Sequence, residues 1–152
     1  MRPLLPDLKS QSGLSDDQDV KDRADQRKLR VLVVDDARDV RNLVAAHLKR
    51  GGHKVLLAAV ADQALEIVTE EQIDLAIIDI MMPGMNGYEL TEKLREMPIT
   101  EDLPIIVLTA RAGGADRAHA FRVGADGYVQ KPFELQRLSD EIASVLALAD
   151  AA

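Results

Sequence analysis

The chain has 152 residues, no cysteine and a formal net charge of −7 at pH 7. This length fits one domain with a sizeable core, and the absence of cysteine excludes disulfides and thiolate metal sites. An acidic chain with few aromatic residues lacks the basic face and stacking side chains that direct nucleic-acid binding needs. Because no apolar stretch approaches the ~20 residues of a membrane span and the start does not resemble a secretory signal, we expect a cytoplasmic protein without membrane insertion.

The first part of the chain differs in composition from the rest. Residues 1–28 combine prolines, serines and mixed charges with few apolar side chains. Such a segment cannot bury enough apolar surface to offset the entropy lost on ordering. We therefore expect a mobile charged tail over residues 1–28 and one folded domain over residues 29–149.

Strand-like and helix-like patterns alternate from residue 29 onward. Short apolar runs predict strands at 30–34, 54–58, 75–79, 105–109 and 128–130. Apolar residues at helical spacing predict helices at 38–50, 61–70, 88–97, 115–123 and 134–149. This alternation with short connections is typical of a doubly wound α/β fold, in which helices cover both faces of a parallel sheet.

Polar side chains end or follow four of these strands: Asp35, Asp36, Asp79, Thr109 and Lys131. The carboxyl ends of parallel strands share one edge of the sheet, which is where open α/β sheets place their binding sites. We therefore expect these five side chains to form one pocket. Carboxylates, a hydroxyl and an ammonium suit a divalent cation and a phosphoryl group.

Simpler structural explanations exist for most of these residues. Asp35 and Asp36 would be suitable caps for the following helix. Taken alone, Thr109 would be an ordinary strand-end hydroxyl and Lys131 a solvated surface lysine. Asp79 is different, because an unpaired carboxylate at the end of a fully apolar strand is costly. The combination of the five residues favours a functional site.

Four segments resemble the receiver domain of two-component response regulators: VVDD (33–36), IDIMMPGMNG (78–87), LPIIVLTA (103–110) and GADGYVQKPF (124–133). They have the order and spacing of that family, and the resemblance covers about residues 29–148. It implies a flavodoxin-like fold, with a five-stranded parallel sheet of order 2-1-3-4-5. It also implies a signalling switch that catalyses only its own phosphorylation and dephosphorylation.

The resemblance implies that Asp79 is the phosphoacceptor and that Thr109 and Lys131 contact phosphoryl oxygens. A carboxylate is ionised at neutral pH, so it can attack phosphorus without a general base and form an acyl phosphate. Phosphoryl transfer then depends mainly on positioning and charge stabilisation. The bond between Lys131 and Pro132 resembles one that the family keeps cis.

The resemblance also implies a Mg²⁺ site, which Mn²⁺ would also fit. Its ligands would be Asp36, Asp79 and the backbone carbonyl of Met81, with Asp35 acting partly through water. Without a cation, three neighbouring carboxylates repel one another and at least one tends to take up a proton. A hard divalent ion removes that repulsion and neutralises phosphoryl oxygens.

Further family positions concern switching and signal lifetime. Tyr128 stands where the family carries an aromatic residue that rotates together with the threonine, here Thr109. Met81 and Arg111 stand two residues beyond the acceptor and the threonine, beside the path of the attacking water. Because neither offers a carboxylate or an amide to orient that water, we expect slow self-hydrolysis.

The implied partners are a histidine kinase or a histidine phosphotransfer protein, and a downstream protein target. The target would bind the face of helix 4, strand 5 and helix 5 of the family, which here is residues 115–123, Tyr128 and residues 134–149. Receivers that dimerise through this face usually carry an acid where this chain has Gly127, and bases where it has Asp140 and Glu141. A stand-alone receiver is therefore the favoured interpretation.

Two alternatives remain open at this point. A phosphohydrolase of the haloacid dehalogenase type also uses a strand-end aspartate, a threonine, a lysine and Mg²⁺. That family needs a second acid two residues after the first, and this chain has Asp35-Asp36-Ala37-Arg38 there. The other alternative is a receiver-like module that binds partners without being phosphorylated, against which the complete set of acids, Thr109 and Lys131 argues.

Overall fold

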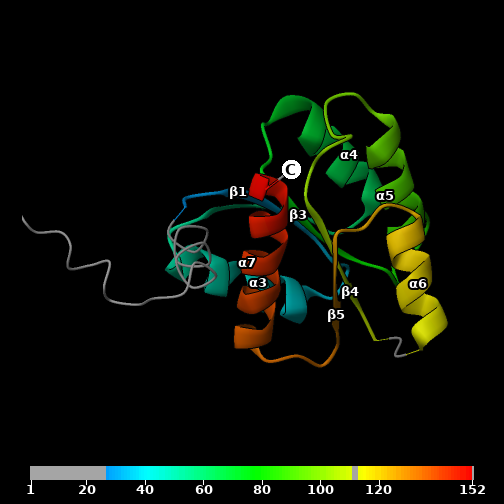
Figure 1. Cartoon of the computed structure of the whole chain (residues 1–152). Coiled ribbons are helices and arrows are strands. Elements are labelled where there is room, and N and C mark those ends of the chain that lie inside the picture. Colours follow the sequence, from blue (N-terminus) through cyan, green and yellow to red (C-terminus); the bar gives the residue numbers. More distant parts are fainter. Residues whose placement is uncertain (1–26, 111–112, 152) are drawn as a thin grey trace, which may run out of the picture.

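The computed structural model describes residues 27–110 and 113–151. Its centre is a five-stranded parallel sheet of order β2-β1-β3-β4-β5 (Figure 1). The strands are β1 (Arg30–Val34), β2 (Lys54–Ala58), β3 (Leu75–Asp79), β4 (Ile105–Thr109) and β5 (Gly127–Gln130). The expected strand order is confirmed. The expected tail lies outside the described residues, apart from Arg27 and Lys28.

Five helices in the described residues cover the sheet: α3 (Arg38–Arg50), α4 (Ala61–Glu70), α5 (Gly87–Glu96), α6 (Gly114–Arg122) and α7 (Leu135–Ala151). One buried cluster joins Val44 of α3 and Leu138 of α7 to one face of the sheet. The other cluster joins residues of α4, α5 and α6, such as Leu90, to the opposite face. Figure 1 shows α3 and α7 on one side of the sheet and α4, α5 and α6 on the other. No helix in these ranges is long and apolar enough to cross a membrane.

The central strands are apolar because both of their faces are covered. Every residue of β3 and of β4 is buried, as expected for parallel strands between two helical layers. Asp79 and Thr109 are the last residues of these two strands. Their polar side chains are therefore held at the boundary between the core and the carboxyl edge of the sheet.

Helix α5 begins one residue earlier than the apolar pattern predicts, and the cause is local capping. The side chain of Asn86 accepts a hydrogen bond from the N–H of Glu89, and the Glu89 carboxylate accepts one from the N–H of Asn86. This reciprocal pair is a capping box. The first helical residue, Gly87, lies so close to the end of β3 that a Cβ there would be 2.4 Å from the carbonyl oxygen of Asp79.

Candidate functional site

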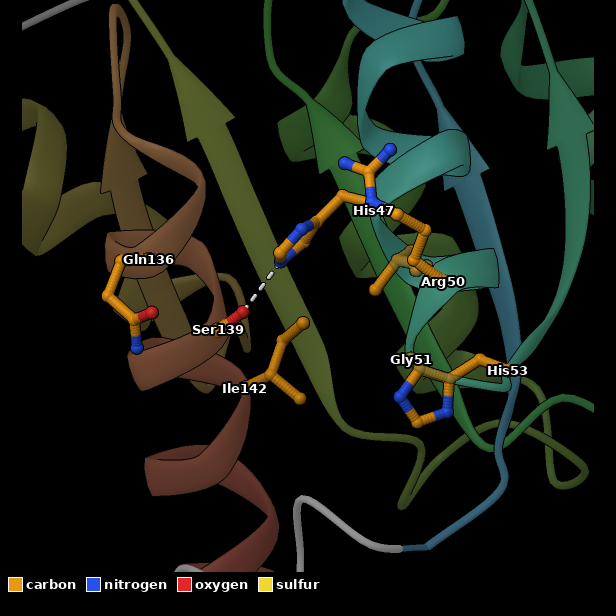
Figure 2. A pocket seen from close by; sticks show the side chains of 8 residues that line it. His47, Arg50, Gly51, His53, Gln136, Ser139 and Ile142 are labelled. Carbon is orange, nitrogen blue, oxygen red and sulfur yellow. Dashed lines mark hydrogen bonds between the residues drawn. The ribbon is translucent and has the colours of Figure 1, made fainter.

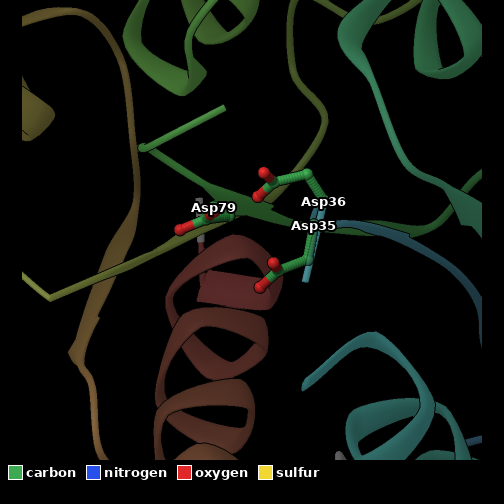
Figure 3. A group of neighbouring side chains, drawn as sticks. All are labelled: Asp35, Asp36 and Asp79. Atoms are coloured by element: carbon green, nitrogen blue, oxygen red, sulfur yellow. The ribbon is translucent and has the colours of Figure 1, made fainter. Parts of the chain in front are cut away.

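Neighbouring strand ends bring the acidic residues of the candidate site together. β1 pairs with β3 in a register that sets Val34 beside Ile78, so Asp35 and Asp79 follow adjacent positions. Carboxylate oxygens of Asp35, Asp36 and Asp79 lie within 4.8 Å of one another (Figure 3). Asp35 and Asp79 are buried, whereas Asp36 is exposed. The acid pocket, which we define as these three residues, is therefore open to solvent on the Asp36 side.

Lys131 closes the buried side of the acid pocket. Its Nζ donates hydrogen bonds to Oδ2 of Asp35 at 2.9 Å and to Oδ1 of Asp79 at 3.2 Å. Burial by itself would lower the pKa of Lys131, but the hydrogen bonds and charges of Asp35 and Asp79 outweigh it and raise the pKa. The lysine therefore stays protonated and serves as a fixed positive charge. The expected cis bond between Lys131 and Pro132 is present.

Asp79 has a perturbed acidity. Burial and the charge of Asp35 raise the pKa of Asp79 to about 6, against the opposing effects of Lys131 and a backbone hydrogen bond from Met81. Lys131 pairs with Asp35 and Asp79, and Asp36 adds a third carboxylate to the same pocket. The donor set is all oxygen and carries excess negative charge, which fits a hard divalent cation such as Mg²⁺.

Backbone contacts fix the position of Asp35. Its Oδ1 accepts a hydrogen bond from the N–H of Ala37 at 2.9 Å, and its carbonyl oxygen accepts one from Arg41 at 2.8 Å. The simpler explanation, in which Asp35 or Asp36 caps the first helix, is wrong: the N-cap residue is Ala37, and α3 has no side-chain cap. Sequence analysis did not single out Arg41, whose only signal was its place one turn into α3.

Two of the remaining expected residues, Thr109 and Tyr128, lie on the two strands beyond β3. Thr109 is fully buried at the end of β4, and its carbonyl oxygen accepts a hydrogen bond from the N–H of Lys131 at 2.7 Å. Tyr128 of β5 is only 5% exposed, and the Arg117 guanidinium carbon lies 5.6 Å from the centre of its ring. The side chain of Met81 is largely exposed. Arg111 lies outside the described residues.

A separate cavity of about 360 Å³ lies between α3 and α7 (Figure 2). Its lining includes three basic side chains, His47, Arg50 and His53. A hydrogen bond of 2.7 Å between His47 Nε2 and Ser139 Oγ crosses from one helix to the other. Burial and the charge of Arg50 lower the pKa of His47. None of these residues belongs to the acid pocket.

Comparison with known families decides between the interpretations of the acid pocket. The model of the response regulator receiver domain matches residues 31–143. The chain belongs to the response regulator receiver domain family. A receiver is a phosphoacceptor and a signalling switch rather than an enzyme with a separate substrate, and it works with a histidine kinase. The haloacid dehalogenase alternative is thereby set aside.

Curated relatives of this receiver include transcriptional regulators that are longer than this chain. The probable transcriptional regulator ycf27 of Porphyra purpurea is 38% identical over 126 residues, which are 83% of this chain and 51% of the relative. The regulator PhoB of Pseudomonas aeruginosa is 35% identical over 76% of this chain and 51% of its own length. The receiver thus spans about half the length of the curated relatives it matches.

Solved structures similar to this receiver are covered almost completely. A putative response regulator from Chloroflexus aurantiacus superposes with a TM-score of 0.76 and 34% identity, over 80% of this chain and 99% of that one. CheY4 of Vibrio cholerae superposes with a TM-score of 0.75 and 30% identity, over 78% and 99% of the two chains.

Proposed function

We propose that Asp79 is the phosphoacceptor of this receiver and takes its phosphoryl group from a histidine kinase or a histidine phosphotransfer protein. An oxygen of Asp79 attacks phosphorus, the bond from phosphorus to the donor histidine breaks, and an acyl phosphate forms. One observation carries the proposal: the Asp79 carboxylate is buried, beside two other acids and 3.2 Å from the ammonium of Lys131. That arrangement is suited to receiving a phosphoryl group rather than to stabilising the fold.

A divalent cation completes this proposal. Asp36, Asp79 and the backbone carbonyl of Met81 would hold Mg²⁺ or Mn²⁺, with Asp35 contributing partly through water. When bound, the ion neutralises carboxylate and phosphoryl oxygens. The role of Asp35 as an indirect ligand is supported by its two oxygens each already accepting a hydrogen bond, one from the N–H of Ala37 and one from Lys131.

The protein's own side chains perform the remaining steps. Lys131 supplies a positive charge to one phosphoryl oxygen, and Thr109 donates its hydroxyl hydrogen to another. Their movement toward Asp79 leaves room for Tyr128 and alters the surface formed by α6, β5 and α7. A downstream protein reads that surface. The phosphoryl group drives the change only through the difference in its contacts with the two states.

The proposal also covers the lifetime of the acyl phosphate, the bounds of the domain and the location of the protein in the cell. Met81 and Arg111 leave the attacking water without a carboxylate or an amide, so the acyl phosphate hydrolyses slowly. Residues 29–149 form one receiver, residues 1–28 form a charged tail, and the protein works in the cytoplasm with its kinase. Residues 1–26 and Arg111 lie outside the described residues.

Phosphorylation by acetyl phosphate tests the proposal. With Mg²⁺, intact-mass measurement should show one added phosphate on the full chain, and chelation should abolish it. Asp79→Asn should remove the added mass, whereas Asp62→Asn, a change at an exposed acid on α4, should keep it. Labelling of Asp79→Asn at the wild-type level would exclude Asp79. Absence of labelling in the wild type would favour the receiver-like module that acts without phosphorylation.

A further inference from the structure

The outer edge of β5 is hydrogen-bonded to side chains of α7 at Tyr128. β5 is the last strand of the sheet and pairs with β4 alone. The other edge of such a strand presents backbone N–H and C=O groups that need partners. At Tyr128 both groups have them on α7: the N–H donates to Oε2 of Glu141 at 3.0 Å, and the carbonyl oxygen accepts from Arg137 at 3.3 Å.

Glu141 and Arg137 act together at this edge. They are one turn apart on α7, and Nη1 of Arg137 lies 2.8 Å from Oε1 of Glu141. The side chain of Glu141 is 18% exposed and that of Arg137 is 46% exposed. The carboxylate therefore uses one oxygen for the strand and the other for the arginine, and the arginine returns to the same residue of the strand.

Gly127 makes the close approach of α7 possible. A Cβ at this position would lie 2.8 Å from Oε2 of Glu141 and 2.8 Å from Cγ2 of Val145. Any other residue would push the carboxylate or the helix away from the strand. The glycine, the carboxylate and the arginine thus form one structural unit around the backbone of Tyr128.

We infer that Glu141 is a positioning residue that couples β5 to α7, with Arg137 as its support. The inference rests on the proposed function, in which the ring of Tyr128 moves into space near Asp79, and it adds that the backbone of β5 at Tyr128 shifts with the ring. Because both polar backbone groups of Tyr128 are bonded to α7, a displacement of β5 at this residue either moves α7 or breaks two charge-assisted hydrogen bonds. The helix therefore reports the state of Tyr128 directly, through its backbone as well as through its ring.

Amide chemical shifts of the full chain, with and without Mg²⁺ and beryllofluoride, test the coupling. In the wild type, shifts should change at the acid pocket, at Tyr128 and along α7. Glu141→Ala should reduce the changes along α7 by more than half, keep those at the pocket, and move the Tyr128 amide proton upfield because its acceptor is lost. Glu141→Gln keeps an oxygen acceptor and should restore most of the response.

Asp140→Ala is the matched control. It removes the neighbouring carboxylate of α7, whose partner is Gln136 of the same helix, and should leave the response of α7 unchanged. Where Glu141→Ala does not fold, Arg137→Met replaces it and should reduce the response in the same direction. Wild-type changes along α7 in the folded variants would overturn the coupling. A wild type without changes at the pocket would remove the proposed function, and the coupling with it.

Discussion

The charged side chains at the two ends of the sheet differ in whether their charges are balanced. At the amino end, Arg95 donates to Oδ2 of Asp126 at 2.8 Å and to the carbonyl oxygens of Gly124 and Leu103 at 2.9 and 2.7 Å. Asp126 also accepts from the N–H of Ile105, the first residue of β4. At the carboxyl end, three acids lie together, and Lys131 pairs with two of them, Asp35 and Asp79.

This difference distinguishes charged groups that stabilise the fold from charged groups that bind a ligand. A buried or half-buried charge stabilises when its partners satisfy it, and it is costly when they do not. The Arg95 cluster, formed by Arg95, Asp126 and the carbonyl groups they hold, is satisfied. The acid pocket carries excess negative charge and becomes balanced when a cation binds. Mutation of the Arg95 cluster should therefore lower the free energy of unfolding. Neutralising an acid of the acid pocket should raise it in the metal-free protein and should weaken cation binding.

Of the changes considered, loss of Arg95 should have the largest effect on the free energy of unfolding. Arg95→Met leaves the Asp126 carboxylate without its guanidinium and several carbonyl oxygens without a donor. We expect a loss of about 2–3 kcal/mol in the free energy of unfolding, measured with urea. Lys93→Met, at an exposed position of the same helix, is the control and should cost little. Equal losses in the two variants would show that the Arg95 cluster is not a stabilising unit.

Neutralising Asp79 should stabilise the metal-free protein. Its pKa of about 6 in the folded chain lies above the ordinary value of 3.8, so the folded state holds this proton more strongly than the unfolded state does. Stability therefore falls as pH rises from about 4 to 6, and the charged group costs about 1–3 kcal/mol above that range. With a chelator present, Asp79→Asn should be the more stable protein at pH 7 and of equal stability near pH 3. A variant that is less stable at pH 7 would contradict this.

Mg²⁺ should stabilise the folded protein through the acid pocket alone, and not through the Arg95 cluster. An ion that binds the folded state at ten times its Kd adds about 1.4 kcal/mol and raises Tm. Asp36→Asn should abolish the rise, whereas Asp39→Asn, an exposed acid in the first turn of α3, should keep it. A full response in Asp36→Asn would exclude Asp36 as a ligand.

Replacing His47, which belongs neither to the Arg95 cluster nor to the acid pocket, should have the smallest effect on the free energy of unfolding. Because burial and Arg50 lower its pKa, the unfolded chain takes up this proton more readily than the folded one. Its contribution to stability is therefore present above pH 6.5 and lost as pH falls through the range below it. His47→Gln should therefore flatten the pH dependence of unfolding just below pH 6.5. An unchanged slope would show that folding does not change the pKa of His47.

Sequence analysis predicted what depends on apolar runs and on strand ends. The bounds of β3 and β4 follow from continuous apolar segments, and the meeting of Asp79 with Lys131 follows because parallel strands share an edge. The start of α5 depends on the Asn86 cap, which an apolar pattern does not contain. The contacts of Arg95 and Glu141 were not predicted, because periodicity places both on polar helix faces and says nothing of distant backbone partners.

The contact between Lys131 and Asp35 joins residues 96 positions apart, and that with Asp79 joins residues 52 positions apart. A ribosome makes the two acids long before it makes the lysine, and a domain generally folds as a unit. A nascent chain that has completed only β1 to β3 holds the carboxylates without their ammonium. Competence to receive a phosphoryl group therefore arrives last, with the final strand, and a kinase meets a working site only on a finished domain.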